Sequence, residues 1–238
     1  MRIFAIGDLH LSFGEKVEKP MDIFGSQWAN HAEKLKEKWE KTVSEEDLVI
    51  ICGDISWGLR LEEAAADFEW IKKLPGKKVL FKGNHDLWWQ SAGKLNKLYG
   101  DENMVFVQNK AFVTEFNGKT LAICGSRGWE CPGYDGFSAD DRKIYDREAL
   151  RLRMSFDEGK AANPDIIIGV LHFPPTNDKM QDSEYTKIMS EYGVHTCVYG
   201  HLHGKEAFKN GLQGIFNGVR YKLVSLDYLD AQPEEVVL

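Results

Sequence analysis

Five short apolar runs are the sequence feature that most constrains the fold of this chain. They cover residues 3–6, 48–52, 79–81, 166–171 and 196–199. A short apolar run bounded by turn residues is typical of a strand buried on both faces, as in a parallel sheet covered by helices. Between the first three runs, residues 27–43 and 60–73 carry apolar side chains at helical spacing. The first half is therefore predicted to alternate strands and helices, as α/β folds do.

The second half of the chain is richer in hairpin signals. Asn-Gly pairs at 117–118, 210–211 and 217–218 each lie between strand-like runs. Asn-Gly favours tight hairpin turns, because both turn residues need a positive φ. Further helices are expected at 87–98, at 139–158 after a capping-box-like start at Ser138, and at 183–192.

These patterns together predict an α/β fold in which two mixed β-sheets pack as a sandwich flanked by helices. The 238 residues fit one large domain better than two, because α/β folds often exceed 200 residues as a unit. We expect a single domain over residues 1–238, with an inserted loop and helix at about 126–160.

Composition limits the classes of partner. The formal net charge is −7, which argues against general nucleic-acid binding through phosphate contacts but not against a small phosphorylated ligand. No apolar run approaches the ~20 residues of a membrane helix, so no membrane partner is expected. The four cysteines lack Cys-x-x-Cys spacing, and the amino terminus shows no signal-peptide pattern. We therefore expect a cytoplasmic protein; the oligomeric state stays open.

Each of the five apolar runs ends in residues that bind metal ions. The endings are Asp8-Leu-His10, Gly-Asp54, Gly-Asn84-His85-Asp86, Leu-His172 and Gly-His201-Leu-His203. Five of the seven histidines fall in these endings. Because ligand sites in open α/β sheets gather beyond the carboxyl ends of the strands, these side chains are predicted to converge.

The donor types favour a transition-metal site. Asp8-x-His10 and His201-x-His203 have the period-2 spacing that places both side chains on one face of an extended segment. Carboxylate, imidazole and amide oxygen are suitable donors for Mn, Fe or Zn. Asp54 has two carboxylate oxygens and could bridge two ions, which lie about 3.5–4 Å apart in two-metal hydrolases.

The order of these motifs over residues 4–203 resembles the calcineurin-like metallophosphoesterase superfamily, with no family element missing. The resemblance implies two divalent metal ions. It assigns one ion to Asp8, His10, Asp54 and His203. It assigns the other to the bridging Asp54 together with Asn84, His172 and His201.

The resemblance also implies a mechanism and two catalytic residues. A metal-bridging hydroxide would attack phosphorus, while His85, which is not a ligand, would contact the phosphate and protonate the leaving oxygen. Asp86 would orient His85. Protein Ser/Thr phosphatases of this superfamily carry Arg-Gly-Asn-His-Glu, whereas this chain has Lys82 through Asp86 as Lys-Gly-Asn-His-Asp, similar to the phosphodiesterase and small-molecule branches.

Four further residues are candidates for substrate binding. Trp57, Trp88 and Trp129 follow the strand ends closely, and Arg127 lies in the same Gly-rich segment as Trp129. One interpretation is a wall that stacks on a base or ring, with Arg127 on the phosphate. The alternative is that the tryptophans pack beneath the loops.

The predicted function is metal-dependent hydrolysis of a small phosphomonoester or phosphodiester. Two alternatives stay open. The sequence does not distinguish a monoester from a diester substrate, and the same fold could serve as a non-catalytic metal-binding scaffold. The full set of ligand residues and His85 argue against the scaffold.

Overall fold

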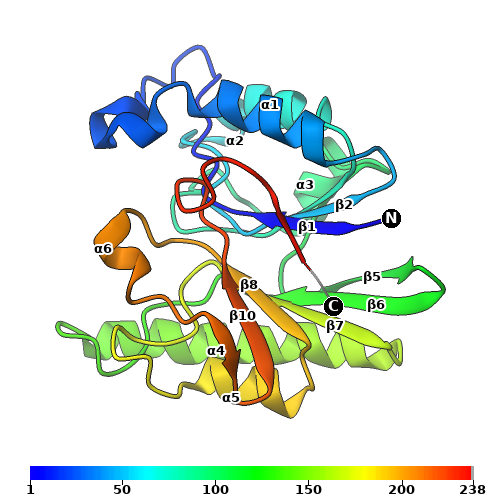
Figure 1. Cartoon of the computed structure of the whole chain (residues 1–238), viewed down its shortest axis with the longest axis vertical. Helices are drawn as coiled ribbons and strands as arrows, with labels where there is room; N and C mark the ends of the chain where they lie inside the picture. Colours follow the sequence, from blue (N-terminus) through cyan, green and yellow to red (C-terminus); the bar gives the residue numbers. More distant parts are fainter. Residues whose placement is uncertain (237–238) are drawn as a thin grey trace.

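The chain folds into four layers, with two β-sheets face to face and helices on both outer sides (Figure 1). The computed structural model describes residues 1–236. The first sheet has the order β11-β1-β2-β3-β4, with bounds Glu234–Glu235, Ile3–Ile6, Leu48–Ile51, Lys77–Leu80 and Met104–Phe106. The second has the order β5-β6-β7-β8-β10-β9, with bounds Ala111–Phe116, Lys119–Gly125, Ile166–Val170, Thr196–Tyr199, Val219–Leu223 and Gly214–Phe216.

Helices cover the outer face of each sheet. The first sheet is covered by α1 (His31–Thr42), α2 (Leu61–Lys72) and α3 (Ala92–Leu98), and the second by α4 (Ala139–Ala161) and α5 (Glu184–Glu191). Three short helices lie in loops: η1 (Met21–Phe24), η2 (Ser26–Trp28) and α6 (Lys205–Phe208). Among the described residues, no helix is long and apolar enough to cross a membrane.

Both sheets are mixed, which confirms the predicted fold class. Strands β1 to β4 run parallel and β11 pairs antiparallel with β1, while β6, β7, β8 and β10 run parallel between the antiparallel edges β5 and β9. The carboxyl ends of β1, β2, β3, β7 and β8 meet at one edge of the sandwich. The five ligand-bearing loops start at these ends.

Three hydrophobic cores fill the three interfaces between the four layers. Side chains alternate along each strand, so Ile3 and Ala5 of β1 enter the core between the sheets, whereas Phe4 and Ile6 face the helices. On β8, Val198 likewise faces the other sheet and Cys197 faces the helices. Residues of both faces are buried, which explains why these strands are continuous apolar runs.

Several predicted elements differ in their ends. The helix expected at 27–43 begins only at His31 and is preceded by η2, and that expected at 87–98 begins at Ala92, where the Ser91 side chain caps it. Asn-Gly pairs at 117–118 and 217–218 form hairpin turns with positive φ at both residues. The pair at 210–211 does not, because it follows the short helix α6. The capping box at Ser138 is present and begins α4.

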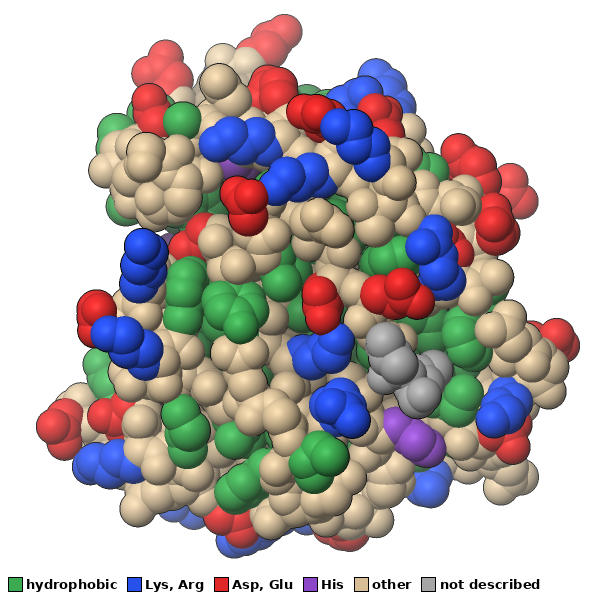
Figure 2. Space-filling view, viewed as in Figure 1, with side chains coloured by type: hydrophobic (Ala, Val, Ile, Leu, Met, Phe, Trp, Pro, Cys, Tyr) green, Lys and Arg blue, Asp and Glu red, His purple; other side chains and the backbone are tan. Residues whose placement is uncertain are grey.

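Figure 2 shows one face of the molecule, on which Lys and Arg side chains are interspersed with Asp and Glu side chains. Green apolar side chains lie between them in small groups. This face therefore presents no broad field of a single sign.

Candidate metal centre

Seven side chains converge where the strands β1, β2, β3, β7 and β8 end. They are the seven residues expected as ligands: Asp8, His10, Asp54, Asn84, His172, His201 and His203. The backbone at Asp8, His10, Asp54 and His201 is left-handed, with φ of 60°, 45°, 51° and 73°. Left-handed backbone is uncommon outside glycine and tends to be retained at functional sites.

This backbone corrects one step of the sequence argument. The Asp8-x-His10 and His201-x-His203 pairs were expected to share a face on the premise that their segments are extended. Tight left-handed turns aim these side chains at the site instead. Two glycines allow neighbouring loops to approach these carboxylates, because a Cβ at Gly83 would collide with the carboxylate of Asp54 and one at Gly200 with that of Asp8.

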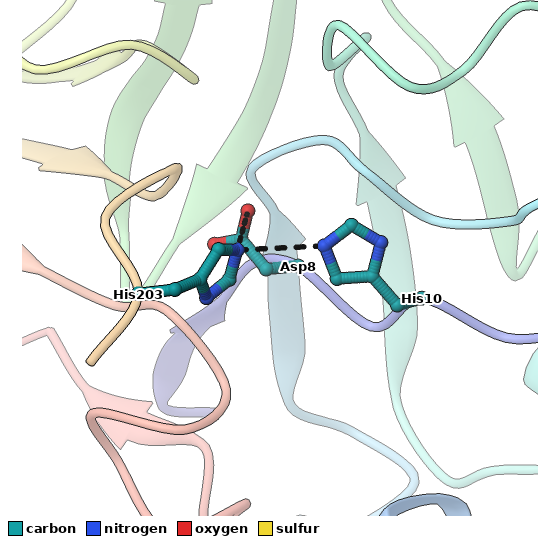
Figure 3. Close-up of side chains that lie close together, drawn as sticks. All are labelled: Asp8, His10 and His203. Atoms are coloured by element: carbon teal, nitrogen blue, oxygen red, sulfur yellow. Dashed lines mark hydrogen bonds and ion pairs between the residues drawn. The ribbon is translucent and has the colours of Figure 1, made fainter. Parts of the chain in front are cut away.

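Asp8, His10 and His203 form the first cluster of donors (Figure 3). Nε2 of His203 lies 3.6 Å from Oδ1 of Asp8 and 3.4 Å from Nε2 of His10. Asp54 approaches the same cluster, with Oδ2 at 3.9 Å from Nε2 of His10. Asp8 is fixed by accepting the backbone N–H of His201 at 3.0 Å.

Asn84, His172 and His201 form the second cluster. Oδ1 of Asn84 lies 2.7 Å from Nε2 of His172 and 3.0 Å from Nδ1 of His201. The two imidazole nitrogens are 3.3 Å apart. Oδ2 of Asp54 is 3.4 Å from Nε2 of His172. Asp54 therefore lies between the two clusters and is in reach of both.

The protonation pattern of the second cluster fits a bound cation. His172 uses Nδ1 to donate to the carbonyl oxygen of Cys52 at 2.9 Å. A neutral His172 then points the lone pair of Nε2 at Oδ1 of Asn84, and an amide oxygen is also only an acceptor. Two acceptors 2.7 Å apart need a proton or a metal ion to hold them together. The donor set thus matches the expected metal chemistry.

Asp227, which sequence reasoning missed, fixes the orientation and tautomer of a histidine in the first cluster. Its Oδ1 accepts Nδ1–H of His203 at 2.9 Å, and its Oδ2 accepts the N–H of Gly204 at 3.0 Å. This fixes the tautomer of His203, so that the lone pair of Nε2 faces the cluster. Asp227 follows β10 by four residues rather than ending an apolar run, but its place after a strand was a usable signal.

The local electrostatics keep the imidazoles of His10 and His201 neutral and the carboxylate of Asp54 charged. Burial lowers the pKa of His10 to about 3, and burial followed by the charge of His172 lowers that of His201 to about 3. Neutral imidazole is the form that binds metal. Burial opposes charge on Asp54, but the neighbouring His172 holds its pKa below the ordinary value. Burial likewise opposes protonation of His172, yet the charge of Asp54 raises its pKa to about 9.

His85 is exposed at the mouth of the site, and its side chain is not part of either donor cluster. Its backbone N–H donates to Oδ1 of Asp54 at 2.8 Å, which fixes it beside the carboxylate that lies between the two clusters. Its ring centroid lies 4.6 Å from that of Trp57 and 5.7 Å from that of His10. The side chain is therefore free to meet a substrate.

The role expected for Asp86 needs correction. In the described part of the chain, no hydrogen bond joins the buried Asp86 carboxylate to the His85 side chain. This carboxylate accepts backbone N–H groups from Gly83 at 2.7 Å, Ile55 at 2.8 Å and Asp54 at 2.9 Å. Burial, and then the charge of Asp54, raise its pKa to about 7. Asp86 therefore ties the loops after β2 and β3 together and positions Asp54 through the backbone.

An apolar pocket of about 390 Å³ opens beside His85. Its lining residues are His10, Met21, Phe24, Gln27, Trp28, Trp57, His85, His203 and Gly204. Trp57 stacks on His10 with ring centroids 4.7 Å apart and donates its Nε1–H to Met21. Trp57 therefore lies where a substrate-binding tryptophan was expected. Trp28, which falls within the apolar helical pattern at residues 27–43, lines the same pocket.

The other candidates for substrate binding lie elsewhere. Trp88 is 1% exposed and packs against Phe68, so its expected place in the substrate wall is wrong and the packing alternative holds. The Trp129 ring packs against Phe173, with ring centroids 5.0 Å apart, and against the guanidinium of Arg127, 4.7 Å from its centroid. Neither Trp129 nor Arg127 lines the apolar pocket.

The loop before α4 borders the second cluster. Oε1 of Glu130 lies 3.8 Å from Nε2 of His201. The carbonyl oxygen of Arg127 accepts the backbone N–H groups of His172 and Phe173, each at 3.0 Å. Phe173 in turn packs on the His201 ring at 4.1 Å. Glu130 is a neighbour of the site that sequence reasoning missed.

A two-sheet sandwich with carboxylate, imidazole and amide donors at one strand-end edge defines a metallophosphoesterase-type protein. The chain belongs to the calcineurin-like phosphoesterase family, whose family model matches residues 1–205. It is similar to the gene 66 protein of Mycobacterium phage D29, at 35% identity over 206 residues that cover 85% of this chain and 79% of that protein.

Solved structures share the fold. The phosphopantetheinyl hydrolase PptH from Mycobacterium tuberculosis is similar with a TM-score of 0.59 and 14% identity, over 99% of this chain and 95% of that chain. A protein of unknown function from Aquifex aeolicus is similar with a TM-score of 0.53 and 15% identity, over 98% and 95% of the two chains. Identities this low show the shared fold alone.

Proposed function

We propose that the protein is a metal-dependent phosphoesterase that hydrolyses a small phosphomonoester or phosphodiester. The observation that carries this proposal is the pair of donor clusters on either side of Asp54, with the exposed His85 beside them. Family membership supports a hydrolase of this general kind. The substrate and the roles below are the proposed part.

Two divalent ions, Mn, Fe or Zn, fit the two clusters. Asp8, His10 and His203 would hold one, and Asn84, His172 and His201 would hold the other. Asp54 would serve both. Bound there, the ions would supply Lewis-acid stabilisation of the phosphate oxygens and activation of a water molecule.

His85 and the pocket beside it would handle the rest of the substrate. A histidine at the mouth can give a proton to the leaving oxygen as the P–O bond breaks. The apolar pocket starts at this histidine, so the organic group attached to that oxygen would lie against Trp57, Trp28 and Met21. These walls favour an apolar or planar leaving group.

The remaining expectations stay part of the proposal. The partner is a small phosphorylated molecule rather than nucleic acid in general or a membrane. All four cysteines are free and buried, which supports a reducing compartment such as the cytoplasm.

A hydrolysis screen tests this proposal. Phosphomonoesters and phosphodiesters are offered in Mn²⁺ to the wild type and to His85→Ala side by side. We expect the wild type to hydrolyse at least one class, and the variant to bind metal but turn over slowly. Metal binding without hydrolysis of any ester would instead support the alternative, a non-catalytic metal-binding scaffold.

A further inference from the structure

A second, basic pocket lies next to the metal centre and takes no part in the proposed reaction. It has a volume of about 240 Å³ and lies at the ends of β3, β4 and β6, against α4. The side chains that give it its character are Lys82, Arg127, Arg147, Arg151, Glu148 and Gln108. Four of these six are cationic, in a chain whose net charge is −7.

One buried carboxylate faces all three arginines of this basic pocket. Oε1 of Glu148 lies 2.7 Å from Arg151, 3.7 Å from Arg127 and 3.9 Å from Arg147. Only the Arg151 contact has the length of a hydrogen bond. The three arginines thus share one negative group. Together with Lys82, the four cations and one carboxylate that line the pocket give it a formal charge of +3. An anion would relieve the mutual repulsion of the cations.

Several donors of the basic pocket lack a partner within the described chain. Nε of Arg127 is buried without a hydrogen bond, and a buried unpaired donor is costly. Lys82 lines the pocket and forms no salt bridge with any of residues 1–236. Gln108 accepts from Trp89 with Oε1 at 3.2 Å, which leaves its amide N–H groups free to donate.

We propose that the basic pocket binds a phosphate or pyrophosphate group, separately from the metal centre. Arginine forks and an ammonium match the oxygens of such a group in geometry and charge. The single carboxylate, Glu148, holds the arginines in place when no anion is present.

The basic pocket adjoins the second donor cluster. Lys82 precedes the ligand-type residue Asn84 by two positions, and the carbonyl of Arg127 binds the backbone of His172. The bound group could therefore be a second phosphate of the substrate or a free phosphate-type anion. Both sources present the same chemistry, and the experiment separates them.

The test uses metal-free protein in EDTA, so that binding does not depend on the proposed catalysis. Inorganic phosphate and pyrophosphate are titrated calorimetrically into the wild type and into Arg147→Gln/Arg151→Gln. Both arginines are accessible, with side chains 54% and 35% exposed, so the variant should fold, and thermal unfolding checks this. We expect about one anion per chain and at least about a tenfold loss of affinity in the variant.

The matched control is Arg142→Gln/Lys143→Gln. These residues lie on the same helix and are exposed, outside the basic pocket, and their replacement changes the net charge equally. We expect their affinity to stay within about twofold of the wild type. No binding by the wild type, or equal losses in both double variants, would overturn the proposal.

A second arm identifies the source and rests on the proposed function. In Mn²⁺, kcat/KM is compared for a bisphosphorylated ester and for its monophosphorylated counterpart. A loss in Arg147→Gln/Arg151→Gln confined to the bisphosphorylated ester assigns the basic pocket to the substrate. If the variant keeps the wild-type kcat/KM on both esters but no longer binds the anion, the basic pocket is assigned to a free anion. Failure of all catalysis would leave the metal-free result standing.

Discussion

Replacement of Asp227 by Asn should weaken metal binding at the first donor cluster without touching a ligand. The Asp227 side chain is 1% exposed and accepts from both His203 and Gly204. An amide has one acceptor and one donor end. Because the Gly204 N–H is a fixed donor, it would take the amide oxygen, and the NH₂ group would then face Nδ1 of His203. That arrangement favours the His203 tautomer with a proton on Nε2, which cannot bind metal.

The expected size follows from this hydrogen bond. Loss of a partner that orients a metal-binding histidine typically costs 10–100-fold in metal affinity, which is about 1.4–2.7 kcal/mol. The hydrogen bond to His203 is short, at 2.9 Å, and its acceptor Asp227 is buried, so we expect the upper half of this range. The second cluster, around Asn84 and His172, should bind as before.

Competition of Mn²⁺ between the protein and a fluorescent chelator measures both affinities. The control is Asp230→Asn, three residues further on, whose carboxylate is 84% exposed and pairs with Lys38 on the surface. We expect the control to match the wild type. Asp227→Asn with both affinities within about twofold of wild type would refute the tautomer argument.

Three further predictions concern the bridging carboxylate, the histidine at the mouth and a buried acid. Asp54→Asn should lower metal occupancy at both clusters, whereas Asn84→Ala should lower it at one, as measured by elemental analysis; equal effects would contradict the bridging role. His85→Ala should keep both ions and lose much of the ~10²–10⁴-fold benefit of an acid on alkyl esters, but less on p-nitrophenyl esters. Equal losses would leave His85 only a positioning role. Burial raises the pKa of Asp67 from 3.8 to about 6, so the folded protein takes up a proton more readily than the unfolded chain. That contribution to stability is present below about pH 4 and is lost as pH rises through about 6. In urea unfolding, the free energy of unfolding of Asp67→Asn should therefore rise relative to that of the wild type as the pH increases from about 4 to about 7. Parallel curves of unfolding free energy against pH for the two proteins would contradict this.

The sandwich and the convergence of the seven donor residues at one edge were predictable from the sequence because both rest on local signals. A buried strand is a short apolar run, and a ligand at its carboxyl end is the next polar residue. Asp8, Asp54 and His172 could therefore be placed at one edge from the sequence alone. The left-handed turns that aim Asp8 and His201 were beyond this reasoning, because alternation along a strand does not report the turn that follows it.

The features that the sequence did not predict depend on contacts between distant segments. Whether Trp88 belongs to a rim or a core is decided by Phe68 on α2. Asp227 acts only because its loop returns to His203 from 24 positions away. The basic pocket combines strand ends with α4, where Arg147 and Arg151 have the spacing of an ordinary solvated helix face.

A pair of metal ions on either side of Asp54 is the core of the proposed function, and anomalous scattering from Mn²⁺-loaded crystals can detect such a pair without any assumption about the substrate. We expect two peaks per chain. One should lie beside Asp8, His10 and His203, and the other beside Asn84 and His201. A single peak, no peak, or peaks away from the Asp54 carboxylate would contradict the two-ion site.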